Sequence, residues 1–105
     1  MIKINGEEWR VFLVSPFHFG LKRSDDIYSL GCCDDNRKTI YISKDIKEQY
    51  LKKVLCHELT HAVMFSYNVD LNFEQEEVLA DIISTHGQEI ITLTNTLFKR
   101  LKENL

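Results

Sequence analysis

The feature that most restricts the fold is a run of apolar residues spaced three and four apart between positions 46 and 63. Such spacing places them on one face of a helix, and this face must pack against another element. The pattern predicts a helix that begins near Asp45, with Glu48 completing an N-terminal capping box, and ends near Asn68. The stripe consists of Ile46, Tyr50, Leu51, Val54, Leu55, Leu59, Ala62 and Val63.

A second, longer helix is predicted from about Glu74 to Leu101, after a short polar connection at residues 70–72. Gly87 falls within it and favours a kink or a break at that point. Its apolar stripe includes Val78, Leu79, Ile82, Ile83, Ile90, Ile91, Leu97, Phe98 and Leu101.

The first half of the chain is typical of β-strands. Residues 2–4 and 9–14 flank Asn5-Gly6, a strong hairpin signal, while residues 15–26 are expected to form a loop with room for one helical turn. Residues 28–33 and 39–43 are β-prone and enclose turn-forming residues, so they predict a second hairpin. Alternation along residues 39–43 suggests a half-exposed strand. We therefore expect one α+β domain over residues 1–105, with a short antiparallel sheet and hairpin packed on the first helix.

Charge and composition exclude several classes of partner. The formal net charge is −3 and Lys and Arg form no long cluster, so we expect no nucleic acid and no membrane as partners. No apolar stretch approaches the roughly 20 residues that a membrane span needs. Three cysteines, Cys32, Cys33 and Cys56, occur without an export signal, and they favour reduced thiols and a cytoplasmic location.

A metal-binding pattern lies inside the first predicted helix. His57-Glu58-Leu59-Thr60-His61 places two imidazoles four residues apart on one helix face. Two imidazoles so placed can bind one Zn²⁺. Glu58 points about 100° away around the helix, so it can act on a metal-bound water without binding the metal.

The third metal ligand should come from the second helix. Glu77 and Asp81 lie four residues apart and share a face. We expect Glu77 to bind the metal and Asp81 to accept a hydrogen bond from an imidazole N–H, that of His57. Glu76 is the competing third ligand, although it would leave Asp81 off the shared face.

Other histidines and the cysteines are weaker candidates. His86 lies nine residues beyond Glu77; it is an alternative ligand, or a group that assists catalysis if Gly87 bends the helix. His18 lies in a loop with aromatic residues and is expected to be structural or solvated. Cys56, next to His57, does not share its helix face, and a small buried apolar role is expected for it.

This combination resembles the gluzincin metallopeptidases, whose pattern is H-E-x-x-H followed by a helix with E-x-x-x-D. The resemblance implies His57, His61 and Glu77 as zinc ligands, Glu58 as general base and Asp81 as support for the first histidine. The short chain and the hairpin before the helix look similar to the ImmA/IrrE-type minimal zincins of bacteria, phages and mobile elements. Thr60 stands where many relatives have glycine.

The expected function is therefore a cytoplasmic zinc-dependent peptidase that acts on a protein or peptide, including repressor-type proteins. One alternative is a zinc-binding regulatory or interaction module without effective catalysis. Another is a DNA-associated protease similar to the SprT-like enzymes, which use a third histidine; the acidic charge argues against it.

Overall fold

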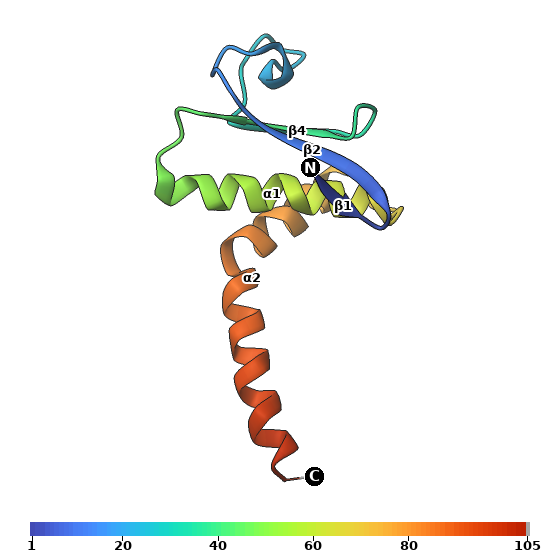
Figure 1. Cartoon of the computed structure of the whole chain (residues 1–105), viewed down its shortest axis with the longest axis vertical. Helices are drawn as coiled ribbons and strands as arrows, with labels where there is room; N and C mark the ends of the chain where they lie inside the picture. The colour runs from blue at the N-terminus through green and yellow to red at the C-terminus, as the bar shows by residue number, and fades with distance from the viewer. Residues whose placement is uncertain (105) are drawn as a thin grey trace.

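The computed structural model describes residues 1–104 and contains a four-stranded sheet and two long helices, so the expected α+β class is confirmed. Figure 1 shows the sheet on one side of α1 and the first part of α2 on the other side. The elements are β1 (Ile2–Ile4), β2 (Glu7–Val14), a 3₁₀ turn η1 (Phe19–Leu21), β3 (Gly31–Asp34), β4 (Thr39–Ser43), α1 (Glu48–Ser66) and α2 (Phe73–Lys102).

The first hairpin forms as predicted. β1 and β2 pair antiparallel, with Ile4 opposite Glu7. Asn5 and Gly6 form the two-residue turn with φ of 49° and 78°, the left-handed backbone that a type I′ turn requires. The hairpin brings Trp9 to the centre of the core, where its side chain is fully buried.

The sheet differs from the expected antiparallel arrangement in one pairing. Its strand order is β1-β2-β4-β3, and β2 runs parallel to β4. The second predicted hairpin is confirmed as the antiparallel β3–β4 pair, although β3 begins only at Gly31. Because β4 lies between two neighbours, the edge of the sheet on this side is β3.

The expectation that residues 39–43 form a half-exposed strand is wrong, since every residue of β4 is buried. Ile40 and Ile42 pack with Trp9 and Ala62 in the core. The opposite face is covered by the loop that contains η1. There, Gly20 lies so close to the Tyr41 ring that an added Cβ would come within 2.6 Å of it. Sequence alternation could not reveal that this loop folds back over the strand.

The first helix is shorter at both ends than predicted. It begins after Lys47, and the predicted capping box of Asp45 with Glu48 does not form. The reason is that Lys44 still donates its backbone N–H to Val14 O at the end of the sheet (2.8 Å), so the following residues are needed to connect β4 to the helix. Asn68, with φ of 53°, lies beyond the end of α1 in the left-handed conformation that stops helices.

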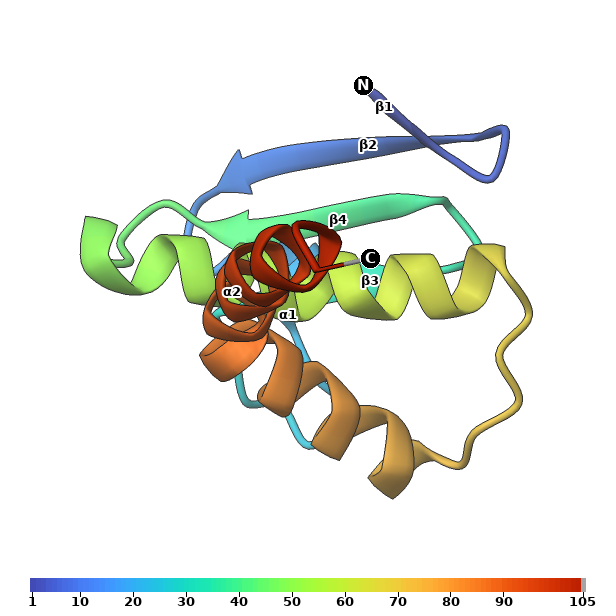
Figure 2. The same ribbon diagram turned by 90° about the horizontal axis from the view of Figure 1, so that it is seen from below.

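The second helix matches its predicted range within a residue at each end. Asn72 caps it through a box with Gln75, in which each side chain accepts a hydrogen bond from the other residue's backbone N–H. The helix is not broken at Gly87. Its ribbon nevertheless changes direction in the orange part (Figures 1 and 2), and Figure 1 shows the last turns projecting away from the rest of the molecule.

Among residues 1–104, no helix combines the length and the apolar character that a membrane span requires.

A buried hydrogen bond ties the sheet to the end of α1. The indole Nε1–H of Trp9 donates to the Ser66 hydroxyl at 2.8 Å, and both residues are buried. Replacing Ser66 with alanine should leave this donor without a partner and lower the free energy of unfolding by about 1–3 kcal/mol. Urea denaturation followed by fluorescence of Trp9, the single tryptophan, measures the change. Ser24→Ala, at an exposed loop position, is the control and should change little.

Candidate metal centre

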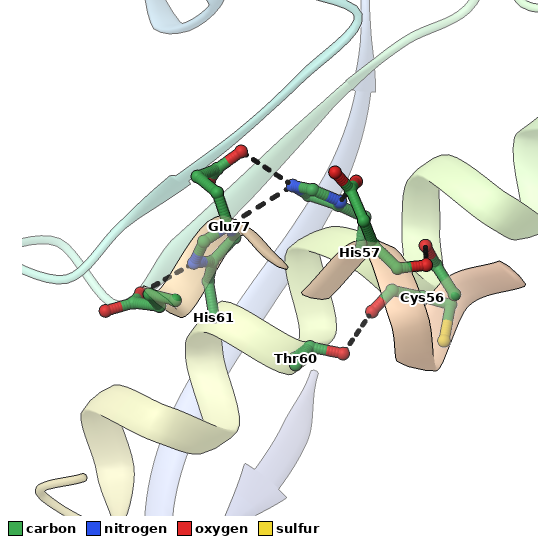
Figure 3. Close-up of polar contacts among 8 residues, drawn as sticks. Cys56, His57, Thr60, His61 and Glu77 are labelled. Atoms are coloured by element: carbon green, nitrogen blue, oxygen red, sulfur yellow. Dashed lines mark hydrogen bonds and ion pairs between the residues drawn. The ribbon is translucent and has the colours of Figure 1, made fainter. Parts of the chain in front are cut away.

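The histidines of the H-E-x-x-H motif lie on the side of α1 that faces α2. The opposite side of the helix packs on the sheet, where Ala62 is fully buried. The first turns of α2 pass across these imidazoles, and Figure 3 shows Glu77 reaching towards both His57 and His61. The helices α1 and α2, which are joined by residues 67–72, therefore both supply side chains to one site.

The ligand atoms of His57, His61 and Glu77 all lie within 4.8 Å of one another. The two Nε2 atoms are 3.2 Å apart. Glu77 Oε1 lies 2.7 Å from His61 Nε2, and Glu77 Oε2 lies 3.5 Å from His57 Nε2. His61 is buried, whereas His57 and Glu77 are partly exposed. The three residues that the sequence analysis proposed as ligands are thus brought together.

Each imidazole also faces a carboxylate with its other nitrogen. Asp81 Oδ1 lies 3.1 Å from His57 Nδ1, and Glu76 Oε1 lies 2.6 Å from His61 Nδ1. A carboxylate at Nδ1 holds the proton there, which leaves Nε2 as a bare acceptor. With both rings in this tautomer, two lone pairs and one carboxylate face one another, and either a bound cation or a proton on one ring relieves the repulsion between them.

Glu76 is the residue whose placement the sequence analysis did not foresee. It was considered as a competing third ligand, but its carboxylate lies behind His61, on the side of the ring away from Glu77. Its side chain is only 15% exposed, compared with 68% for Asp81. Adjacent helical residues point about 100° apart. The neighbouring acids Glu76 and Glu77 were therefore the signal that one could bind the metal while the other contacts a histidine from behind.

The carboxyl group of Glu58 lies in a tight space between α1 and the edge strand. An added Cβ at Gly31 would come within 2.9 Å of both Glu58 Cγ and Val54 Cγ1. Glu58 is only 8% exposed. Burial raises the pKa of its carboxyl group, and Glu77 raises it further, whereas the two imidazoles lower it. A carboxyl group with a raised pKa is suited to exchanging protons near neutral pH.

Two clefts open beside Glu58 along β3. One, of about 410 Å³, is lined by Cys32, Cys33, His61, Phe73 and Glu77, among others. The other, of about 350 Å³, is lined by Leu30, Tyr50, Val54, His57 and Ser84, among others. Both include Gly31 and Glu58. The Glu58 side chain therefore lies between two clefts beside the edge strand β3.

The cysteines line the site without resembling ligands. Burial is the main reason why the pKa values of Cys32 and Cys33 are raised, and the charge of Glu58 adds to the effect. Neither cysteine belongs to the group of side chains that could hold a metal ion. Cys56 is half-buried rather than fully buried as expected, and it lies at another groove between α1 and α2.

The remaining histidines lie elsewhere. His86 is exposed on α2 and is not part of the group formed by His57, His61 and Glu77. His18, expected to be structural or solvated, is partly buried: its Nδ1 accepts the backbone N–H of Gly20 at 2.9 Å and its ring stacks on that of Phe19.

Comparisons of the chain with protein-family models, with curated proteins and with solved structures found no match.

The close approach at Gly31 gives a test of how the site is assembled. Gly31→Ala should push Glu58 and Val54 aside and lower the melting temperature, since the new methyl group overlaps buried side chains. Gly87→Ala is the matched control, because an added Cβ there meets only ordinary contacts at 3.4 Å. In a helix this change should be neutral or stabilising, by up to about 1 kcal/mol. Equal effects of the two variants in calorimetry would contradict this description of Gly31.

Proposed function

We propose that the chain is a zinc-dependent peptidase in which His57, His61 and Glu77 hold the metal and Glu58 is the general base. The observation that carries the proposal is the convergence of three acceptors in one place, with a carboxylate behind each imidazole. Outer carboxylates of this kind accompany metal-binding histidines because they fix the ring and increase its basicity.

The spacing of the donor atoms suits zinc. A tetrahedral ion with Zn–N distances of 2.0–2.1 Å separates two nitrogen ligands by about 3.3–3.4 Å, and the two Nε2 atoms lie 3.2 Å apart. Two imidazoles and one carboxylate are also a donor set of catalytic zinc sites, which keep a fourth position for water. Within residues 1–104, the group comprises these three side chains.

Glu58 provides the proton transfer that peptide hydrolysis requires. Zinc, when bound, supplies Lewis acidity that lowers the pKa of a water ligand towards about 7. The Glu58 carboxylate accepts the proton of the attacking water and then donates it to the leaving amine. Its raised pKa reduces the cost of holding that proton between the two steps.

The edge strand offers a place for the substrate backbone. β4 is internal to the sheet, and β3 is the strand at the edge beside Glu58. An extended peptide can add to a sheet edge by backbone hydrogen bonds. Along β3 it would pass Gly31, which lies directly against the Glu58 side chain. A protein or peptide segment in extended form is therefore the proposed substrate class.

The alternative of a zinc-binding module without catalysis remains a second candidate, because it uses the same ligands. Buried Glu58 is the observation that favours the enzyme, since a purely structural site gains nothing from an acid placed beside the ligands at a cost in desolvation. The exposed position of His86 gives no support to a site with three histidines.

Zinc affinity should depend on the ligands in a defined order. Glu77→Ala should lower the zinc affinity the most, since it removes a ligand. Glu76→Gln should weaken binding by about 10–100-fold, and Asp81→Asn by less, because Asp81 is the more exposed partner. His86→Ala is the control and should bind as the wild type does. Titration against a competing chelator measures each constant. Retention of zinc by Glu77→Ala, or failure of the wild type to bind zinc at micromolar concentration, would overturn the ligand assignment.

Catalysis can be tested separately from metal binding. Glu58→Gln should bind zinc with the affinity of the wild type but lose cleavage of an unstructured peptide mixture, measured by mass spectrometry. A wild type that binds one zinc per chain yet leaves the mixture intact would favour the binding module. Loss of zinc from Glu58→Gln would mean that Glu58 is itself a ligand.

A further inference from the structure

The last turns of α2 have no packing partner within the described residues. Every residue from 88 to 104 is exposed, and Figure 1 shows this part leaving the sheet and α1. The radius of gyration is 16.1 Å, whereas a compact domain of this length has about 13 Å. We call residues 88–102 the arm.

The composition of the arm is poor for a helix standing alone in water. Five of the seven residues from 90 to 96 are β-branched, and such residues lose side-chain freedom in a helix. Isolated helices shorter than about 12–15 residues are marginal in water even when they are rich in alanine. An arm of this composition therefore depends on contacts with another surface for its stability.

One face of α2 carries a seam that continues along the arm. Its members alternate in spacing of four and three residues, which is the spacing of two packed helices. Beside the seam, Ile91 and Phe98 widen the apolar face; they are 57% and 62% exposed. An exposed apolar face of this extent marks an interaction site. The seam consists of Ile83, Gly87, Ile90, Thr94, Leu97 and Leu101.

We propose that the arm pairs with the arm of a second copy of this chain, in antiparallel orientation. A two-fold axis level with the midpoint between Thr94 and Leu97 makes the seam complementary to itself, as a symmetric dimer requires. It places Ile90 opposite Leu101 of the second copy. This pairing buries the apolar face on both arms at once.

The charges beside the seam select the antiparallel orientation. At 100° per residue, Glu89 and Arg100 fall on one flank of the seam and Lys102 on the other. In an antiparallel pair, each flank of one helix lies beside the same flank of the other helix. Glu89 therefore lies beside Arg100 of the second copy, and symmetry repeats this contact. In a parallel pair opposite flanks meet, which would bring Arg100 beside Lys102 of the second copy. Opposite charges stabilise such helix pairs and like charges destabilise them.

The groove at the base of the arm fits this pairing. It has a volume of about 660 Å³, lies between α1 and α2, and includes Ile83, Gly87 and Ile90 of the seam. The proposed axis brings Asn104 of the second copy to the level of Gly87. The end of the second arm therefore lies at the level of the groove.

Sedimentation velocity on the full chain, from low to high micromolar concentration, tests the pairing. The wild type should form a dimer. Leu97→Arg should raise the dimer dissociation constant by at least about tenfold, and Thr92→Arg, on the opposite face, should leave it unchanged. Fluorescence emission of buried Trp9 checks that the sheet and α1 stay folded in both variants. A wild type that stays monomeric, or equal effects of the two variants, would overturn the proposal and leave the seam to another partner.

Charge reversal tests the orientation. Glu89→Arg and Arg100→Glu should each weaken the dimer several-fold, and the double variant should regain most of the loss, since it restores the pair with the signs exchanged. A double variant that dimerises less well than either single variant would exclude the antiparallel arrangement.

Discussion

Three proton-accepting groups meet where α2 crosses α1, and most of the structure serves to hold them there. His57 and His61 are fixed because the opposite face of α1 is packed on the sheet, around Trp9 and Ala62. Glu77 is fixed because the Asn72 capping box begins α2 at the right residue. The carboxylates of Glu76 and Asp81 then decide which imidazole nitrogens face the centre. The ligand atoms of the three groups lie within 4.8 Å of one another, and this convergence is the physical basis of the proposed zinc site.

The parts of the structure that depend on local spacing could be predicted from the sequence. The 3.6-residue period predicted both helices, and Asn5-Gly6 predicted the first hairpin. The four-residue spacing predicted that His57 shares a helix face with His61, and Glu77 with Asp81. In each case the prediction needed only the geometry of one element. The helices contain the three proposed ligands, Glu58 and the two carboxylates behind the imidazoles.

Features that depend on contacts between distant segments could not be predicted in this way. The parallel pairing of β2 with β4, and the loop that buries the outer face of β4, arise from residues far apart in sequence. For the same reason the sequence did not show that β3 forms the edge of the sheet. The role of Glu76 behind His61 depends on how α2 crosses α1, and periodicity carries no information about that angle.

The site and the arm place different demands on α2. Its first turns are held by α1 and by the capping box, whereas residues beyond 88 are exposed to solvent. The bend in the ribbon separates these two parts (Figure 1). A change in the arm can therefore alter self-association and leave the metal ligands in place, which makes the two proposals independent of each other.

The central claim is the identity of the metal ligands, and X-ray absorption spectroscopy of the zinc-loaded protein tests it most directly. The account predicts only nitrogen and oxygen neighbours at about 2.0–2.1 Å, with the multiple-scattering signature of two imidazoles. Sulfur at about 2.3 Å would implicate the cysteines, and a third imidazole would implicate His86 or His18. Either result would contradict a site made of His57, His61 and Glu77.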